Sequence, residues 1–323
     1  QVRGLVVASE QAKTPKGAKD KVEEAKAAVR AFHVKLCHTR VLDPACGSGN
    51  FLYVTLDLFK RLEGEVLGLL ESLGEKQTLM HLGTVRVTPE QFHGIEVKRW
   101  AKEIAELVLW IGYLQWHFRL YGKSIPVPEP VLRDYKNIEC RDAVLAWDGA
   151  PEPICDATGE PVTRWDGEST KLNSITGEQV PDETKRVPVY KYRNPRKAEW
   201  PEADFIVGNP PFIGSKRMRE ALGDGYVDAL RGAYDMVPDG TDLVLYWWTR
   251  AAELLRNARV RRFGFITTNS ITQSMNRRAT EAALFNSANA AILWAIADHP
   301  WVDSATGAAP WRRWVSPEKS RVC

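Results

Sequence analysis

Residues 43–51 read Asp-Pro-Ala-Cys-Gly-Ser-Gly-Asn-Phe, and the two glycines of this stretch constrain the fold more than any other feature of the chain. The apolar residues in 40–42 predict a short buried strand before it, and the large apolar side chains at helical spacing in 51–59 predict a helix after it. Glycine lets the backbone turn tightly and approach a ligand where a Cβ would collide. The N–H groups at the helix start favour an anionic group of that ligand. The stretch predicts the first strand, turn and helix of a nucleotide-binding unit, although the third glycine of the dinucleotide fingerprint is missing.

A second strand and helix follow, predicted over 91–96 and 97–120, and Glu96 ends the strand. A carboxylate at the end of a second parallel strand can accept hydrogen bonds from both hydroxyls of a ribose, and the alternative is an acid that only caps the helix. A third short strand and its exit turn are predicted over 137–143. Asp142 in that turn can accept a hydrogen bond from an adenine amino group, although acids are common at such turns.

Residues 148–200 change in character, because Gly, Pro, Thr, Glu and Asp dominate there. Two short phrases nearly repeat, ATGEPV at 157–162 and ITGEQV at 175–180. Thr-Gly-Glu between β-favouring residues predicts two hairpins in an inserted flap. Such a flap projects from the ligand-binding side of the sheet, where it either contacts the substrate or is a passive excursion.

The rest of the chain continues the alternation of strands and helices. A buried strand is predicted over 205–207, and Asn209, Pro210, Pro211 and Phe212 follow it. The other predicted elements are an exposed helix over 20–32, a helix over 241–255, a strand with a polar exit over 262–270 and a strand over 290–297. This alternation predicts an α/β fold with a doubly wound, mostly parallel sheet and a β-hairpin insertion.

Charge and cysteine content exclude some classes of protein. The chain has 323 residues with 44 Lys+Arg and 41 Asp+Glu, and the net charge of +3 is too small to prove a polyanionic partner. Basic residues are unevenly placed, however, and one crowded group forms either a solvated surface or a phosphate-binding surface: Arg256, Arg259, Arg261 and Arg262. The five cysteines include no CxxC pair and are odd in number, which predicts a reduced, cytoplasmic protein without disulfides or structural zinc.

His33, Cys37 and His38 lie close together, but we find no further metal ligands for them in the sequence and interpret them as surface or packing residues. No metal site is therefore predicted. No apolar run reaches membrane-spanning length and no signal peptide opens the chain, so we expect no membrane partner.

The prolines after the strand at 205–207 point to a particular chemistry. They remove two backbone donors and fix the turn, which leaves the preceding carbonyls free as acceptors. The exocyclic amine of adenine is a poor nucleophile, because its lone pair is delocalised into the ring. Fixed acceptors for its two N–H groups favour a more tetrahedral nitrogen, and the Asn209 side-chain oxygen and the Pro210 carbonyl are the natural pair. Phe212 can stack on a base that has left the duplex.

With both loops in view, the chain resembles the methyltransferase module of the γ-ordered N6-adenine DNA methyltransferases, particularly the fused restriction–modification enzymes of type IIL. The resemblance rests on residues 41–51, 93–101, 137–147, 204–219 and 265–271. It implies a class I, Rossmann-like fold, S-adenosylmethionine as cofactor and double-stranded DNA with a flipped adenine as partner.

The resemblance also assigns residues. The methionine part of the cofactor falls to Asp43, Pro44, Ala45, Cys46, Gly47, Gly49 and Phe51. Glu96 is implied to hold the ribose and Asp142 the adenine of the cofactor. The target base falls to Asn209, Pro210, Pro211 and Phe212. The family's order, cofactor loop before catalytic loop, is present here.

We expect this sequence to lack two parts of the family pattern, namely the N-terminal cofactor element before the glycine loop and a target-recognition domain after Trp314. We expect residues 1–38 to be a shortened helical lead-in, 39–314 the catalytic domain with its flap at about 148–200, and 315–323 a shortened end. Target-recognition and nuclease parts are then expected as fused or separate partners. The alternatives are a methyltransferase for an RNA base or a protein glutamine, whose loop has the same Asn-Pro-Pro-aromatic pattern, and an inactive DNA-binding fragment. Residues 214–219 and 269–273 favour the DNA enzymes.

Overall fold

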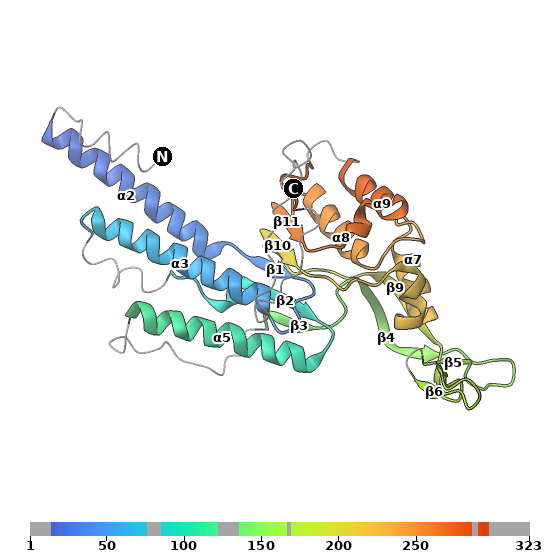
Figure 1. Ribbon diagram of the computed structural model, residues 1–323. Coiled ribbons are helices and arrows are strands. Elements are labelled where there is room, and N and C mark those ends of the chain that lie inside the picture. Colours follow the sequence, from blue (N-terminus) through green and yellow to red (C-terminus); the bar gives the residue numbers. More distant parts are fainter. Residues whose placement is uncertain (1–13, 76–84, 122–135, 167–168, 286–289, 297–323) are drawn as a thin grey trace. The chain divides into compact units, whose positions relative to one another are not determined.

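The computed structural model describes residues 14–75, 85–121, 136–166, 169–285 and 290–296 (Figure 1). The chain divides into two compact units. Unit 1 comprises residues 1–141 and 201–207, and unit 2 comprises residues 142–200 and 208–323. The glycine-rich stretch therefore belongs to unit 1, whereas the Asn-Pro-Pro-Phe stretch belongs to unit 2.

Unit 1 is built on parallel strands in the order β10, β1, β2, β3. Their bounds are Phe205–Gly208 for β10, Val41–Asp43 for β1, Phe92–Glu96 for β2 and Ile138–Cys140 for β3, with Gly208 already in unit 2. In the register, Val41 lies between Phe205 and Phe92, and Gly94 pairs with Ile138. Parallel neighbours need long crossover connections, which helices usually provide. The mostly parallel sheet predicted from the sequence is confirmed.

Three long helices accompany these strands: α2 (Pro15–His38), α3 (Asn50–Ser72) and α5 (Arg99–Tyr121), with a short 3₁₀ turn η1 (Pro89–Gln91) before β2. The start of α2 follows the usual chemistry, because the Thr14 hydroxyl accepts from the Gly17 N–H at 3.1 Å and proline occupies the first turn. The predicted helices over 20–32, 51–59 and 97–120 are all present. Helix α3 is longer than predicted, since its apolar spacing continues to Ser72.

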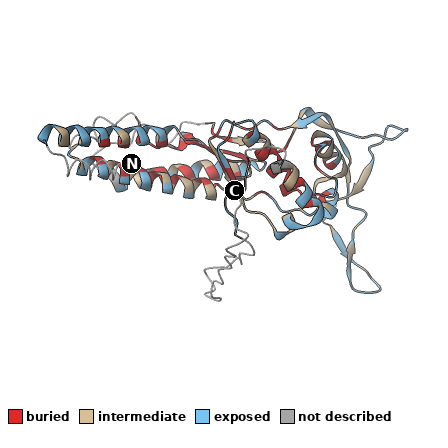
Figure 2. Cartoon of the chain, turned by 90° about the horizontal axis from the view of Figure 1, so that it is seen from above, coloured by how far each residue is buried: buried red, intermediate tan, exposed pale blue. Residues whose placement is uncertain are grey.

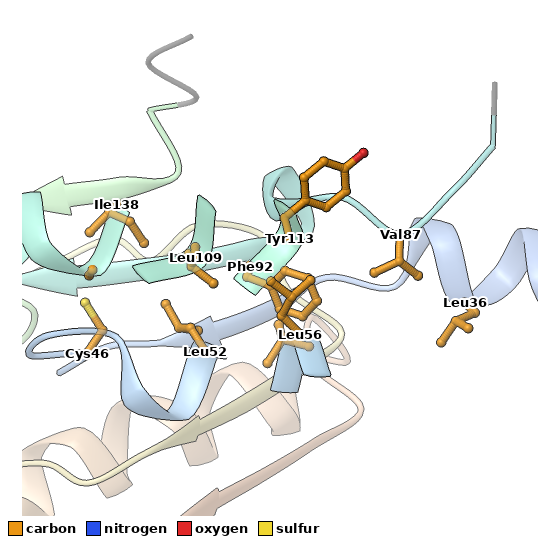
Figure 3. Close-up of a cluster of buried hydrophobic side chains, with 11 residues drawn as sticks. Leu36, Cys46, Leu52, Leu56, Val87, Phe92, Leu109, Tyr113 and Ile138 are labelled. Atoms are coloured by element: carbon orange, nitrogen blue, oxygen red, sulfur yellow. The ribbon is translucent and has the colours of Figure 1, made fainter. Parts of the chain in front are cut away.

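The core of unit 1 lies between the strands and these helices. Figure 3 shows Cys46, Leu52, Leu56, Phe92 and Leu109 directed toward one another from the glycine-rich turn, α3, β2 and α5. Exposed residues follow the outer faces of the long helices, and buried residues gather where the helices meet the strands (Figure 2). The end of β1 and the start of α3 are thus held in place by the packed core on which they lie.

Unit 2 carries the predicted insertion as antiparallel strand pairs. The pairs are β4 (Leu145–Pro153) with β9 (Tyr190–Lys197), β5 (Thr163–Trp165) with β8 (Arg186–Pro188), and β6 (Thr170–Leu172) with β7 (Gln179–Pro181). Both repeated phrases form reverse turns, since the Glu160 carbonyl accepts from the Asp156 N–H at 2.9 Å and the Glu178 carbonyl from the Asn173 N–H at 2.9 Å. The predicted β-hairpin insertion is confirmed.

The rest of unit 2 is mainly helical. It contains η2 (Ser215–Arg217), α6 (Met218–Leu222), α7 (Asp224–Ala233), α8 (Val244–Arg256), β11 (Arg262–Phe265), η3 (Asn269–Thr272) and α9 (Ser274–Phe285). Helix α8 carries buried aromatic side chains, and Trp248 meets Phe263 of β11 edge to face with ring centroids 5.1 Å apart. The predicted helix over 241–255 and the beginning of the predicted strand over 262–270 are present. Helices α7 and α9 were not predicted.

The predicted strand over 290–297 is wrong where the structure describes it. Residues 290–296 form no strand, and Leu293, Trp294 and Ile296 are each more than half exposed. The apolar run alone suggested a buried strand, but these described residues belong to none of the sheets. Within the described ranges, no helix combines the length and apolar character needed to cross a membrane.

Candidate functional site

The glycine loop, residues 43–49, connects β1 to α3 in unit 1. Gly47 and Gly49 have left-handed φ values of 53° and 85°, and Gly49 is the residue immediately before α3. A Cβ on Gly49 would lie 3.0 Å from the Ala105 Cα of α5, whereas one on Gly47 would meet nothing within 4 Å. Gly49 is therefore required by packing, whereas a Cβ on Gly47 would meet only open space.

Asp43 ends β1 and is 1% exposed. Its Oδ1 accepts from the Ala45 N–H at 3.0 Å, whereas its buried Oδ2 has no hydrogen-bond partner among the described residues. Burial, together with the nearby Glu96 carboxylate, raises the pKa of Asp43 to about 7. A buried acceptor without a donor is costly, so this oxygen is suited to a donor or a positive charge on a ligand.

Glu96 ends β2 and holds the glycine loop. Its Oε2 accepts from the Gly47 N–H at 3.0 Å, and its Oε1 accepts from the Lys98 N–H at 2.9 Å. The backbone adds a second connection, because the Cys46 N–H donates to the Ile95 carbonyl at 3.1 Å. The structure thus brings Glu96 and the glycine loop together, and each carboxylate oxygen keeps a second lone pair for a ligand.

Asp142 lies in unit 2, two residues after the end of β3. Its Oδ1 accepts from the N–H groups of Val144 and Leu145 at 2.8 and 2.9 Å. Its Oδ2 accepts from the Tyr226 hydroxyl of α7 at 2.7 Å. Burial and the nearby Asp142 raise the pKa of Tyr226, so the phenol stays protonated and acts as the donor. Tyr226 orients Asp142, and nothing in the sequence near Asp142 indicated it.

The target loop, residues 209–215, follows β10 directly and lies in unit 2. The Asn209 side-chain oxygen is buried and has no hydrogen-bond partner among the described residues. Pro210 is buried, Pro211 is exposed, and Phe212 is 41% exposed. An amide oxygen without a donor and an exposed aromatic ring are thus three residues apart. This arrangement is suited to bind a flat ligand that carries an N–H donor.

Asp242, which lies outside the target loop in the sequence, holds the end of that loop by a hydrogen bond. Its Oδ1 accepts from the Ser215 N–H at 3.0 Å, and its Oδ2 accepts from the Ser270 hydroxyl and the Asn276 amide, each at 2.7 Å. Asn276 is 5% exposed, and its side-chain oxygen accepts from the Asp242 N–H at 2.8 Å. The Leu243 N–H donates to the Ile213 carbonyl at 2.9 Å. Ionised acceptors form the stronger hydrogen bonds, so this network fixes the segment that follows Phe212.

The predicted site residues fall into two sets. Unit 1 brings together the glycine loop with Asp43, Pro44, Ala45, Cys46, Gly47 and Gly49, the first turn of α3 with Phe51, and Glu96. Unit 2 holds Asp142 and, in the target loop, Asn209, Pro210, Pro211 and Phe212. Sequence reasoning missed Tyr226, Asp242, Ser270 and Asn276. Their only early signal was the polar exit predicted after β11, which contains Ser270.

Comparison with known proteins points in one direction. The family model described as MmeI, DNA-methyltransferase domain, matches residues 19–312. DNA methyltransferase A of Bacillus subtilis (strain 168) is 27% identical over 242 residues, which are 72% of this chain and 21% of that protein. A putative type II restriction enzyme and methyltransferase of Methanocaldococcus jannaschii, RM.MjaORFECS2P, is 27% identical over 128 residues, or 39% of this chain and 10% of that protein.

A solved structure is similar over almost the whole length. The type IIL restriction–modification enzyme MmeI, determined in complex with DNA, aligns with a TM-score of 0.53 and 25% sequence identity. The alignment covers 96% of this chain and 34% of that one. The chain thus spans between 10% and 34% of the length of these relatives.

Proposed function

This chain belongs to the MmeI DNA-methyltransferase domain family, and we propose that it transfers a methyl group from S-adenosylmethionine to the N6 amino group of adenine in DNA. We further propose that it acts as the methyltransferase part of a restriction–modification system. The observation that carries the proposal is the buried, unpartnered side-chain oxygen of Asn209, directly before two prolines and an exposed Phe212. This is the acceptor that an exocyclic amino group needs.

The residues of unit 1 fit the proposed cofactor. S-adenosylmethionine supplies the methyl group on a sulfonium centre when bound, and its methionine part carries an ammonium group. Asp43 offers a buried oxygen without a donor, and Glu96 adds a second carboxylate beside the glycine loop. Two acids at one loop favour a cationic ligand. We assign the ammonium group to Asp43 and the ribose hydroxyls to Glu96. The space beside Gly47, where an added Cβ would meet no atom within 4 Å, is the volume we assign to the cofactor.

The residues of unit 2 fit two adenine rings, the one in the cofactor and the target adenine of the DNA. Asp142, oriented by Tyr226, accepts from the amino group of the cofactor's adenine. Asn209 Oδ1 and the Pro210 carbonyl accept from the two N–H groups of the target adenine. These hydrogen bonds draw the amino nitrogen toward tetrahedral geometry and stabilise the positive charge that develops as the nitrogen attacks the methyl carbon. With the cofactor bound, its sulfonium centre would supply the methyl group as the C–S bond breaks, and the amino nitrogen would release one proton to water.

The target base must leave the helix to reach Asn209. Phe212 is exposed at the end of the target loop, and its ring can stack on the flipped base. Arg256, Arg259, Arg261 and Arg262 are all exposed on unit 2 and supply positive charge for contact with phosphates. Duplex DNA with a flipped adenine is therefore the proposed partner, with target-recognition and nuclease parts in the same or in separate chains.

The proposal is tested by offering the purified chain labelled S-adenosylmethionine with three substrates: duplex DNA of mixed sequence, structured RNA, and a protein acceptor that presents glutamine. We expect label only in DNA, and N6-methyladenine as the modified base after digestion to nucleosides. Label in RNA or protein, or in another DNA base, would contradict the proposal. If no substrate is labelled, the same assay with the chain joined to the other parts of its protein decides whether those parts are needed.

A further inference from the structure

A second polar cluster lies in unit 1, away from the residues that the proposed function uses. His33 and Glu63 are each 1% exposed, and Cys37 is half-buried. His33 Nε2 lies 3.3 Å from Glu63 Oε1 and 3.5 Å from Cys37 Sγ, and Cys37 Sγ lies 3.9 Å from Glu63 Oε1. We propose that these three side chains, the His33–Cys37–Glu63 cluster, bind one transition-metal ion and that zinc is its occupant.

The distances between these side chains are those of long hydrogen bonds, and they also match the ligand separations around one shared ion. A hydrogen bond between imidazole nitrogen and carboxylate oxygen is usually near 2.7–3.0 Å, and the observed separation is longer. Zinc binds histidine nitrogen at about 2.0–2.1 Å, carboxylate oxygen at about 2.0–2.2 Å and cysteine sulfur at about 2.3 Å. In a tetrahedral site with these bond lengths, the nitrogen and oxygen ligands are about 3.4 Å apart, and the sulfur is about 3.6 Å from either. The separations of 3.3, 3.5 and 3.9 Å between the three side chains are close to these ligand–ligand distances.

The ligand types select the kind of ion. A thiolate, an imidazole and a carboxylate together suit zinc and related transition metals, whereas calcium and magnesium prefer oxygen ligands alone. His33 and Cys37 are four residues apart on α2 and therefore share one face of the helix, and Glu63 comes from α3. In the described part of the chain the group consists of these three side chains, which leaves one position of a tetrahedral ion to a further ligand.

Neighbouring groups hold the Glu63 carboxylate in place. Its Oε2 accepts from the Lys60 ammonium at 2.8 Å, and its Oε1 accepts from the Val87 N–H at 2.8 Å. Lys60 is 2% exposed and lies 4.9 Å from the centre of the Tyr113 ring. Such outer contacts commonly orient metal-binding carboxylates. Because the Lys60 charge offsets part of the negative charge of Glu63, the site needs the Cys37 thiolate to attract the ion.

Metal binding must displace a proton. Binding of one divalent ion forms the metal–sulfur bond, breaks the S–H bond of Cys37 and releases that proton to water, without any change of oxidation state.

The position of the cluster indicates a structural role. Glu63 lies thirteen positions after Asn50, the first residue of α3. At a rise of about 1.5 Å per residue this places it roughly 20 Å along α3 from the glycine loop, too far to act in methyl transfer. A bound ion instead joins α2 to α3. It would stabilise the folded chain by the free energy of binding.

The test uses the full 323-residue chain, purified without chelators. Its zinc content is measured by elemental analysis, and cobalt is then added to the metal-free chain. We expect about one zinc per chain, and a thiolate-to-cobalt charge-transfer band with the intense visible bands of tetrahedral cobalt. Cys37→Ser and His33→Gln should each lose the bound zinc. With cobalt, each variant should lose either the charge-transfer band or the tetrahedral pattern of visible bands. Cys155→Ser and His38→Gln alter exposed residues of the same types and should change neither.

The opposite results would overturn the proposal. A folded wild-type chain that holds less than a tenth of an equivalent of zinc after loading, and shows no cobalt bands, would mean that the cluster is only a buried hydrogen-bonded network. Metal that is retained in Cys37→Ser but lost after brief dialysis against a chelator would mean adventitious binding elsewhere. Circular dichroism of each variant identifies any that fails to fold, and the cobalt titration of the wild type gives a result that does not depend on them.

Discussion

The glycine loop and the target loop are held in different ways. The glycine loop is fixed by its own backbone and by the neighbouring strand: two left-handed glycines, a strand end at Asp43, and the Gly47 N–H on Glu96. The target loop is fixed by side chains from distant segments, above all Asp242, which accepts from Ser215, Ser270 and Asn276. The first loop is therefore defined by local geometry and the second by a network.

This difference suits the two proposed ligands. A cofactor that is bound in every cycle needs a stable cradle, and backbone hydrogen bonds beside a packed core provide one. A flipped base is bound only when DNA is present, and it needs acceptors whose geometry is set before the base arrives. Asn209 suits this proposed role, because its oxygen has no partner among the described residues while Asp242 holds the loop after it.

The largest effect is expected from Asn209→Ala, which removes the acceptor but leaves the glycine loop unchanged. Loss of one preorganised polar contact typically lowers a rate by about 100- to 1000-fold. Methylation of DNA should fall by this amount, measured as labelled N6-methyladenine under single-turnover conditions, while the dissociation constant of S-adenosylmethionine changes little. Asn257→Ala, at an exposed asparagine of unit 2, is the control. A wild-type rate in Asn209→Ala would show that the nitrogen is not activated at this residue.

Gly47→Trp is expected to weaken binding of the cofactor, which Asn209→Ala should leave nearly unchanged. The space beside Gly47 is open, so a large side chain would occupy the volume assigned to the cofactor and strain a backbone with φ of 53°. Steric conflict of this kind costs about 1–3 kcal/mol, which is roughly a 5- to 150-fold weaker binding constant. Calorimetric titration with S-adenosylmethionine and its demethylated product measures it. Gly232→Trp also enters open space, in unit 2, and should bind the cofactor normally.

A smaller loss is expected from Asp242→Asn, which tests whether the network positions the target loop. The asparagine amide cannot accept from Ser215, Ser270 and Asn276 together, because an NH2 donor group replaces one of the two carboxylate oxygens. We expect the rate of methyl transfer to fall about tenfold, consistent with about 1–3 kcal/mol for a disturbed buried polar group, with unchanged cofactor affinity. Asp235→Asn at an exposed position is the matched control. Equal losses of rate and cofactor affinity would indicate general destabilisation instead of positioning.

The same contrast explains what could be predicted from the sequence. The glycine loop, the strand ends at Asp43 and Glu96 and the hairpin insertion follow from residue types and spacing within short windows. Tyr226 lies 84 positions from Asp142, and Asn276 lies 34 positions from Asp242, so no local pattern links them. Glu63, similarly, lies 30 positions from His33 and joins it only after α2 and α3 have packed. The strand predicted over 290–297 failed for the opposite reason, because an apolar run does not reveal whether a pairing strand exists.

The smallest effect concerns Asp43, the buried acid of the glycine loop, and is measured as the pH dependence of stability. Burial and the nearby Glu96 raise the pKa of Asp43 from 3.8 to about 7 in the folded chain. Between these values the unfolded chain has released the proton and the folded chain has kept it. The folded state therefore binds more protons there, and stability falls as the pH rises from about 4 to about 7. Asp43→Asn should remove this part of the slope in urea unfolding, and Asp235→Asn should leave it.

Cofactor binding should have the opposite pH dependence, since the ammonium group of S-adenosylmethionine favours the ionised form of Asp43. Affinity is then expected to rise severalfold as the pH increases through about 7, and Asp43→Asn should both weaken binding and flatten the profile. Asn209→Ala should retain the wild-type profile, because its effect is confined to the target loop. If Asn209→Ala shifts the profile as much as Asp43→Asn does, the two loops are energetically coupled and the contrast between them fails. If neither variant changes it, the ammonium group is not held by Asp43.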